Sequence, residues 1–327
     1  MKEVKKILIS RIDSIGDVIF TFPICGWLKN KFPESQIYFL GRTYTKDVIA
    51  CCNDVDVFLN IDEIFQLNKK QQIQILKNYN FDEVINVFPN KEVSKLFCKS
   101  KIPIRIGTTN RIYHWRYCNK LIRLSRKNSN FHETQLNFFL LKYLGLKQIP
   151  TLEEILQLLN FKNKNQLEKK YLDLLDENKT KIILHPKSNN SSVEWSLENY
   201  SKLIELLPKK KFQIFISGTE KEKILLQPFL EKHKNQIVDL VGKINLSDFI
   251  SFINLCDGLI ACSTGPLHIA SALGKFALGL FPSTRPIHSQ RWKPIGTNAH
   301  YIESGTKNLD NIFPEKILEY FSLKHNI

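Results

Sequence analysis

Two short turns carry polar residues whose types and spacing suit chemistry on an anionic or hydroxyl-bearing ligand. The later turn, residues 262–268, reads CSTGPLH and joins an apolar run to a helical pattern, with Pro266 suited to the first helical turn. Amides at a helix start attract anions, and the Ser263 and Thr264 hydroxyls add further partners. The turn is therefore a candidate phosphate cradle, with His268 one helical turn further along. The alternative is an ordinary turn capped by Ser263, with His268 in the core.

The earlier turn, residues 11–19, reads RIDSIGDVI and follows the first apolar run of the chain. Gly16 permits close approach of the backbone to a ligand, and Asp17 supplies a carboxylate able to act as a general base. The pattern differs from GxGxxG, so dinucleotide binding is poorly supported. In the alternative interpretation, Asp13 or Ser14 caps a helix and Asp17 occupies its first turn, where the helix dipole favours a negative charge.

Three loops in the second half offer further candidates. Lys187, in the loop HPKS, is able to meet a phosphate. The turn Ser217-Gly218-Thr219 is small and polar enough to approach a nucleotide. Arg285 begins the loop RPIHSQRW, and arginine pairs bidentately with phosphate or carboxylate. Each loop also has a structural alternative. The first would be an ordinary solvated loop, in which Trp195 anchors the following helix. The second would be a capped turn, and the third a basic surface loop.

The elements that must position these turns alternate between short apolar runs and helical patterns. Strands are predicted at 5–10, 36–40, 55–59, 83–87, 102–106, 181–185, 212–217, 237–240, 258–262 and 276–281, with helices between them, and one helix is predicted at 132–144. This alternation predicts an α/β fold with parallel sheets. A chain of 327 residues is long for one core, and residues 148–170 lack strand signals, so we predict two Rossmann-like domains, 1–160 and 161–327. Ligands of such sheets bind beyond the carboxyl ends of the strands, in a cleft that would collect loops from both domains.

Composition narrows the class of protein. No apolar run reaches about 18 residues, so no membrane span is expected. The seven cysteines include no CxxC pair, which indicates reduced, mostly buried thiols, a cytoplasmic location and no zinc site. The net charge of +15 favours an anionic partner: nucleic acid, an anionic membrane face or phosphorylated molecules. A general lysine bias of the composition is the alternative cause, and no RNP1-type signature supports nucleic acid.

Taken in order, these motifs resemble the heptosyltransferase family of bacterial glycosyltransferases, glycosyltransferase family 9. The first turn, 14–18, is similar to the family's opening, and Arg105-Ile106-Gly107 and His132-Glu133 also fit. The specific part runs from Val241-Gly242 to Ala272-Leu273-Gly274 and includes the turn at 262–268. The likeness spans nearly the whole chain.

The resemblance implies a GT-B fold of two facing Rossmann-like domains, with a C-terminal helix at about 313–327 returning to the N-terminal domain. It implies an inverting transfer from a nucleotide sugar that needs no metal and no cofactor. The first domain would bind an anionic, lipid-linked saccharide acceptor, at the inner face of the cytoplasmic membrane. Asp17 would be the general base. The other implied site residues are Arg11, Ser14 and Gly16 for the acceptor, and Ser263, Thr264, Gly265, Pro266, His268, Lys187, Ser217, Gly218, Thr219 and Arg285 for the donor.

Two positions depart from the family pattern. Ser263 stands where family members commonly carry Asp or Asn, and Glu194 stands where heptosyltransferases carry a Lys before the Trp. A cation that would contact phosphate is therefore missing, unless Lys187 or Arg285 replaces it. Two other functions remain open: a GT-B transferase that uses a different donor to build capsule or another surface glycan, and a non-catalytic nucleotide- or glycan-binding homologue.

Overall fold

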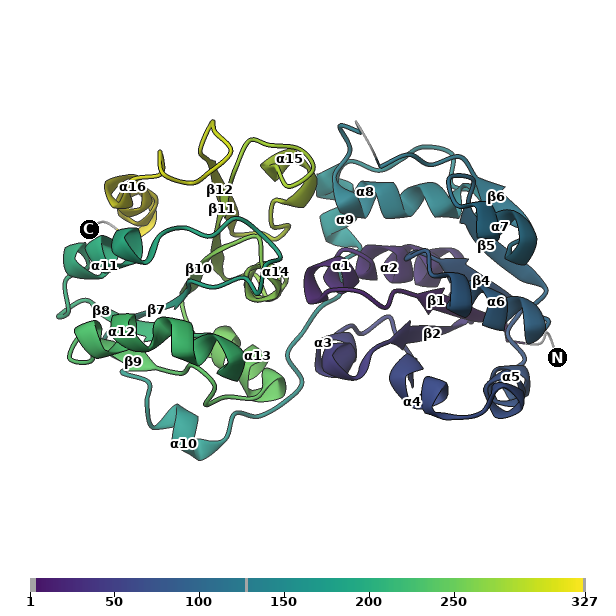
Figure 1. Ribbon diagram of the computed structural model, residues 1–327, viewed down its shortest axis with the longest axis horizontal. Coiled ribbons are helices and arrows are strands. Elements are labelled where there is room, and N and C mark those ends of the chain that lie inside the picture. The colour runs from purple at the N-terminus through teal and green to yellow at the C-terminus, as the bar shows by residue number, and fades with distance from the viewer. Residues whose placement is uncertain (1–3, 127–128, 326–327) are drawn as a thin grey trace. The chain divides into compact units, whose positions relative to one another are not determined.

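The computed structural model describes residues 4–126 and 129–325, and the chain forms two compact units, Met1–Lys162 and Asn163–Ile327. The division falls close to the boundary predicted at 160. Each unit contains a six-stranded, all-parallel sheet with helices on both faces (Figure 1). The predicted α/β class with two Rossmann-like domains is confirmed.

The first unit has the strand order β3-β2-β1-β4-β5-β6, so the direction of winding reverses between β1 and β4. Its strands are β1 (Lys6–Ser10), β2 (Gln36–Gly41), β3 (Val57–Asn60), β4 (Glu83–Asn86), β5 (Ile104–Thr108) and β6 (Lys120–Ile122). Its helices are α1 (Ile15–Ile19), α2 (Phe22–Lys31), η1 (Thr43–Thr45), α3 (Lys46–Ala50), α4 (Ile61–Gln66), α5 (Lys69–Asn78), α6 (Lys91–Lys99), α7 (Ile112–Tyr117), α8 (Glu133–Phe138), η2 (Phe139–Leu144) and α9 (Leu152–Gln157).

The second unit repeats this topology in the order β12-β11-β10-β7-β8-β9, with the reversal between β10 and β7. Its strands are β7 (Thr180–His185), β8 (Phe212–Ile216), β9 (Ile237–Asp239), β10 (Gly258–Cys262), β11 (Phe276–Phe281) and β12 (Ala299–Glu303). Its helices are α10 (Lys169–Leu172), α11 (Leu197–Leu206), η3 (Glu220–Glu222), α12 (Lys223–His233), α13 (Leu246–Leu255), α14 (Gly265–Ala272), α15 (Ser289–Trp292) and α16 (Pro314–His325).

Each unit has its own hydrophobic core. In the first unit Leu8, Leu40 and Val84 of neighbouring strands pack with apolar side chains of the covering helices. In the second unit Ile182 and Ile260 occupy the equivalent central positions. Every residue of β10 and β11 is buried, as expected for parallel strands covered on both faces. The topological reversal in each sheet leaves a crevice position at the carboxyl ends of its central strands, where ligands of this architecture bind.

The C-terminal helix α16 contributes to the core of the second unit. It packs against α11 of its own unit, and Ile317 is fully buried in the core of that unit. Just before the helix, the Ile312 carbonyl accepts a hydrogen bond of 2.9 Å from the Trp195 indole. These contacts hold α16 on the second unit, and its predicted return to the N-terminal domain stays a prediction.

Several local predictions differ from the structure. The single helix predicted at 132–144 is α8 followed by the 3-10 helix η2, ending at Gly145 with a φ of 90°. The region treated as a linker contains α9. The short edge strands β6 and β12 were not predicted. None of the seven cysteines is in a disulfide, and six of them are buried, which agrees with the expectation of mostly buried thiols.

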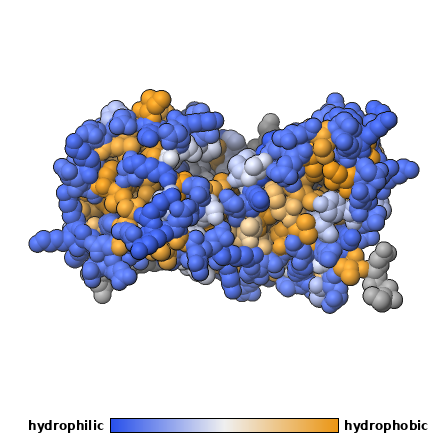
Figure 2. Space-filling view, turned by 90° about the horizontal axis from the view of Figure 1, so that it is seen from below, coloured by the Kyte–Doolittle hydropathy of each residue, from blue (hydrophilic) through white to orange (hydrophobic). Residues whose placement is uncertain are grey.

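The face of the molecule shown in Figure 2 is mainly hydrophilic, with hydrophobic residues in separate areas. Among the described residues, none of the helices combines the length and hydrophobicity needed to cross a bilayer.

Candidate active site

The candidate site of the first unit lies where β1 ends, beside the reversal point of the first sheet. Asp17 is in the first turn of α1, which begins after Ser14, and its carboxylate is 15 % exposed. The Ser14 hydroxyl donates a hydrogen bond of 2.5 Å to one Asp17 oxygen, and the Arg11 guanidinium pairs with the other. Gly16 is buried beneath them. A carboxylate that is held on both oxygens, yet partly open to solvent, is fixed in position and still reachable by a ligand.

Arg11 is the centre of a buried ionic cluster. Its side chain is only 3 % exposed. Nε lies 2.6 Å from Asp13 Oδ1, and Nη1 lies 3.5 Å from Glu133 Oε1 and donates to Asn137 at 3.3 Å. Because three carboxylates surround this guanidinium, it is already engaged by the protein. This placement favours a role in positioning Asp17 over the predicted contact with an acceptor.

Helix α8 supports the cluster from a distant part of the chain. Glu133 also pairs with Arg126 at 3.0 Å. Thr134 and Asn137 both donate to the Phe20 carbonyl, at 2.9 and 3.1 Å, just after α1. The end of α1 is thereby tied to α8. The resemblance pointed to His132-Glu133, but no pattern in the sequence indicated that Glu133 meets Arg11.

Burial dominates the protonation of Asp13. Its desolvation raises the pKa to about 6, because this effect and the nearby Asp17 charge outweigh the stabilising pair with Arg11. For Arg11, desolvation lowers the pKa, but Asp17, Asp13 and Glu133 together raise it above its ordinary value. Arg11 therefore stays positive, while Asp13 titrates close to neutral pH.

The candidate site of the second unit lies where β10 ends, at the reversal point of the second sheet. Thr264 is the N-cap of α14, with extended backbone, and Pro266 is in the first helical turn. Thr264 caps the helix in place of the predicted Ser263. The Thr264 side chain makes no capping bond, and its buried hydroxyl oxygen has no hydrogen-bond partner among the described residues. A buried hydroxyl of this kind, beside free amides at a helix start, is suited to an anionic oxygen.

The neighbouring strand ends complete that edge of the sheet. His185 ends β7 and its Nδ1 lies 2.9 Å from the Ser217 hydroxyl, which follows β8. Burial lowers the pKa of His185 to about 4, although the charges of Glu222 and Glu194 oppose the shift. The imidazole is therefore neutral near pH 7. His268 is also buried, one turn into α14.

Lys187 has a protein carboxylate as its partner. Its Nζ lies 2.6 Å from Glu194 Oε2, and the Ser188 amide donates to the other oxygen at 2.8 Å. Burial raises the pKa of Glu194, but Lys187 and Ser188 outweigh it and the pKa lies below its ordinary value. Lys187 therefore brings no net positive charge to this edge. The sequence showed Glu194 in place of a cation, but not that the two side chains pair.

The turn after β8 is held by Glu222. This buried carboxylate accepts from the Thr219 amide at 2.7 Å and from the Thr219 hydroxyl at 2.8 Å. Its other oxygen accepts from the Asn189 amide at 3.1 Å. Gly218 lies in this turn, close to Glu222. The Thr219 donors are thus occupied, which leaves Gly218 as the open part of the predicted nucleotide turn.

The loop after β11 contributes Arg285, which is exposed, and His288, which is buried. Neither ring nitrogen of His288 has a hydrogen-bond partner among the described residues. Burial, with Arg285 as the next cause, lowers the pKa of His288. Trp195 is fully packed against Tyr200 in the core, which is the anchoring role given as the alternative.

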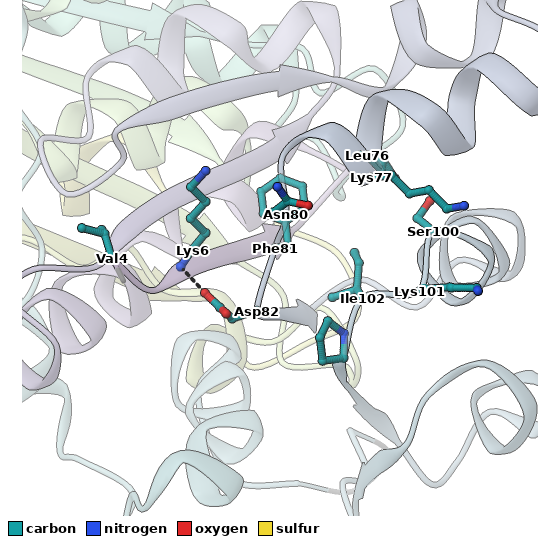
Figure 3. A pocket seen from close by; sticks show the side chains of 11 residues that line it. Val4, Lys6, Leu76, Lys77, Asn80, Phe81, Asp82, Ser100, Lys101 and Ile102 are labelled. Atoms are coloured by element: carbon teal, nitrogen blue, oxygen red, sulfur yellow. Dashed lines mark hydrogen bonds between the residues drawn. The ribbon is translucent and has the colours of Figure 1, made fainter. Parts of the chain in front are cut away.

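A pocket of about 500 Å³ lies at the opposite edge of the first sheet. It is lined at the amino ends of β1, β4 and β5, where the Lys6 amide donates to Asp82 at 2.7 Å (Figure 3). Because ligands of parallel sheets bind at the carboxyl ends, this pocket is separate from the candidate site. Within the described residues, no cluster of three or more His, Cys, Asp or Glu side chains is arranged to hold a metal.

Comparison with known proteins places this geometry in context. Residues 70–319 match the model of glycosyltransferase family 9 (heptosyltransferase). A Haemophilus influenzae protein, named as a glycosyltransferase, is 28% identical over 305 residues, covering 89% of this chain and 86% of that protein. Lipooligosaccharide heptosyltransferase 2 of Haemophilus ducreyi is 24% identical, covering 83% of this chain and 80% of that protein. The structure of E. coli ADP-heptose lps heptosyltransferase II has a TM-score of 0.77 at 16% identity, covering 98% of each chain.

Proposed function

This chain belongs to glycosyltransferase family 9, the heptosyltransferase family, and from that membership we propose which transfer it performs. The enzyme moves a sugar, with inversion at the anomeric carbon, from a nucleotide-sugar donor to a lipid-linked saccharide of the lipopolysaccharide-core type. The relative from Haemophilus ducreyi is named as a lipooligosaccharide heptosyltransferase, and the E. coli structure as an ADP-heptose enzyme. ADP-heptose is accordingly the first donor to assay.

The proposed mechanism is a single displacement. Asp17 takes the proton of an acceptor hydroxyl as that oxygen attacks the anomeric carbon. The bond between this carbon and the donor diphosphate breaks, and the diphosphate leaves with the bonding electrons. Ser14 and Arg11 keep the Asp17 carboxylate oriented, so that its position requires no rearrangement during the reaction.

The leaving diphosphate is stabilised in this proposal by the start of α14. The Thr264 hydroxyl and the first amides of the helix receive phosphate oxygens, and Ser263 and His268 border them. Lys187 is paired with Glu194, and in this proposal the exposed Arg285 contributes a positive charge near the phosphates. In this proposal the hydrogen-bond donors of the protein and Arg285 stabilise the negative charge of the leaving diphosphate, without a metal ion or cofactor.

The observation that carries the proposal is Asp17, a carboxylate held on both oxygens at the reversal point of a parallel sheet. Substitution D17N preserves the size of the side chain but removes the base. We expect turnover to fall by roughly 10²–10⁴-fold, the usual contribution of a general base. Donor binding, measured by calorimetry with ADP-heptose, should stay within about twofold because the donor turn lies in the other unit.

Substitution S14A is the companion variant, because it removes one of the two bonds that orient Asp17 and leaves the carboxylate present. We expect a smaller loss than for D17N, seen in kcat and not in donor affinity. Full turnover in D17N would remove Asp17 as the base. Loss of donor affinity in D17N would instead assign Asp17 to donor binding.

A donor other than ADP-heptose is the second candidate, favoured by the pair between Lys187 and Glu194. This pair neutralises Lys187, one of the two residues that were expected to replace the cation carried before the Trp in the family pattern. Profiling turnover with a panel of nucleotide sugars distinguishes the two candidates: activity with ADP-heptose alone rejects the second.

A further inference from the structure

Helix α7 in the first unit exposes two large apolar side chains on one face. Ile112 is 90% exposed and Trp115, three residues later, is 66% exposed. On an α-helix, residues three apart lie next to each other on the same side. Between them in the sequence, His114 is fully buried, and its Nδ1 accepts from the Thr108 amide at 2.9 Å. The helix is thus anchored on one side and presents an apolar pair on the other.

The side chain of Trp115 can enter an apolar environment without leaving its indole N–H unpaired. Its indole Nε1 donates to the Thr109 carbonyl at 3.0 Å. The only polar group of the ring is therefore satisfied within the protein, so that moving the ring into hydrocarbon leaves no donor unpaired. An unpaired donor would oppose such a transfer strongly. The bond also fixes the ring in its outward position.

The chain around α7 is strongly basic. Residues 93–132 contain ten Lys and Arg and no Asp or Glu, so this stretch carries most of the net charge of +15. Arg111 and Arg116 flank the apolar pair and are exposed, as is Arg123. Within the described part of the chain, none of these three arginines forms a salt bridge. Their charges are therefore available to an external anion.

We propose that α7 is a docking site for a bilayer containing anionic lipids, with Ile112 and Trp115 entering the interfacial region and Arg111, Arg116 and Arg123 facing the lipid phosphates. Apolar side chains surrounded by cations are the combination that binds an anionic bilayer surface, and tryptophan favours that interface. A soluble anionic partner would use the arginines but leave the apolar pair in water. The lipid-linked acceptor of the proposed function gives the docking its purpose, but the binding itself requires no turnover.

The test is cosedimentation of the full-length protein with vesicles. We expect binding to vesicles of phosphatidylglycerol and phosphatidylcholine, and little binding to phosphatidylcholine alone. The double substitution I112S/W115S should weaken binding at least about tenfold, because it removes two large apolar groups. The matched control is I224S/L225S in α12 of the second unit, where the two side chains are 84% and 62% exposed. This control should bind as the unaltered protein does.

A charge-reversal pair tests the basic component separately. We expect R111E/R116E to weaken binding to anionic vesicles at least about tenfold, since each basic residue near such a surface contributes about one factor of five. The control K210E/K211E changes the net charge equally, in an exposed loop of the second unit, and should have a much smaller effect. Because these residues are on the surface, this pair still tests the proposal if I112S/W115S fails to fold.

Quenching identifies the inserted ring. Vesicles with brominated acyl chains should quench tryptophan fluorescence in the unaltered protein and much less in W115F, although Trp27, Trp195 and Trp292 remain. Equal binding to neutral vesicles, unchanged binding of both α7 variants, or equal losses in the controls would each overturn the proposal. So would a concentration-dependent dimer that I112S/W115S abolishes, which would assign the surface to a second copy. Each of these results leaves the sugar transfer untouched.

Discussion

Individual side chains around Arg11 control the position of the proposed base, Asp17, and the charge next to it. Asp13 and Asp17 share this guanidinium, so the charge of one acts on the other. Burial raises the pKa of Asp13 to about 6, and Asp13 is therefore neutral below that pH and negative above it. A negative Asp13 pairs fully with Arg11, and this pair helps to hold the guanidinium that orients the Asp17 carboxylate.

We expect kcat/KM to rise as the pH increases through about 6, as Asp13 loses its proton. In D13N this step should disappear and the profile should flatten, because the titrating group is gone. The measurement is kcat/KM from about pH 5 to about pH 8 for both proteins. An unchanged step in D13N would mean that another group titrates there.

Asp13 also links pH to stability. Its pKa in the folded protein lies above the ordinary value of 3.8. The folded state therefore holds this proton more tightly than the unfolded chain does. The resulting contribution to stability is present at low pH and is lost as the pH rises through about 6.

At the level of elements, the two reversal points present different kinds of groups. The end of β1 holds fixed carboxylates, whereas the start of α14 offers amides and the Thr264 hydroxyl, which has no partner among the described residues. Substitution T264V keeps the shape of the side chain and removes the hydroxyl. We expect the dissociation constant for ADP to rise about tenfold, the scale of one hydrogen bond to a charged group.

Calorimetric titration with ADP measures this effect. The matched control is S271A, because Ser271 is in the same helix but its hydroxyl donates to the His268 carbonyl at 2.9 Å, beyond the first helical turn. The affinity of S271A for ADP should match that of the unaltered protein. Equal affinities of T264V and S271A would exclude the Thr264 hydroxyl from the phosphate site.

Helix α16 is expected to stabilise the second unit through its buried side. Ile317 is fully buried beside α11, so I317A leaves a cavity that the surrounding side chains fill only in part. We expect the free energy of unfolding of this unit to fall by about 2–5 kcal/mol. Urea denaturation followed by circular dichroism gives this value. The control is K316A, because Lys316 is the exposed neighbour of Ile317. This substitution should change the free energy of unfolding by less than about 0.5 kcal/mol.

Features of the site that depend on neighbouring residues could be predicted from the sequence, whereas contacts between distant residues could not. Strand-to-helix turns are encoded locally, so Asp17 and Thr264 were found at the carboxyl ends of β1 and β10. Contacts between distant residues are not local: Glu133 lies far along the chain from Arg11, and its charge had no visible target in the sequence. The burial of Arg11 among carboxylates could not be predicted for the same reason, and its predicted contact with the acceptor stays a prediction. The strand β6 has only three residues, too few for a periodic pattern.

At the scale of the whole molecule, the two units have separate cores, so we expect a ligand to stabilise one unit against unfolding and not the other. We expect differential scanning calorimetry to show two transitions, of which ADP raises only that of the second unit. At a ligand concentration of about 100 times the dissociation constant, the added stability is about 2.7 kcal/mol. T264V should reduce the shift. Equal shifts of both transitions would show that ADP contacts both units or that they unfold together.

The bonds made by Glu222 have a mechanical consequence. One carboxylate holds the amide of Asn189, in the loop after β7, and the amide of Thr219, in the turn after β8. These two segments therefore behave as one rigid piece, and neither can shift without breaking a bond of about 3 Å to the same side chain. A substrate that displaces one segment must carry the other along. Changing the shape of this edge, by evolution or by engineering, therefore begins at Glu222 and not at the loops themselves.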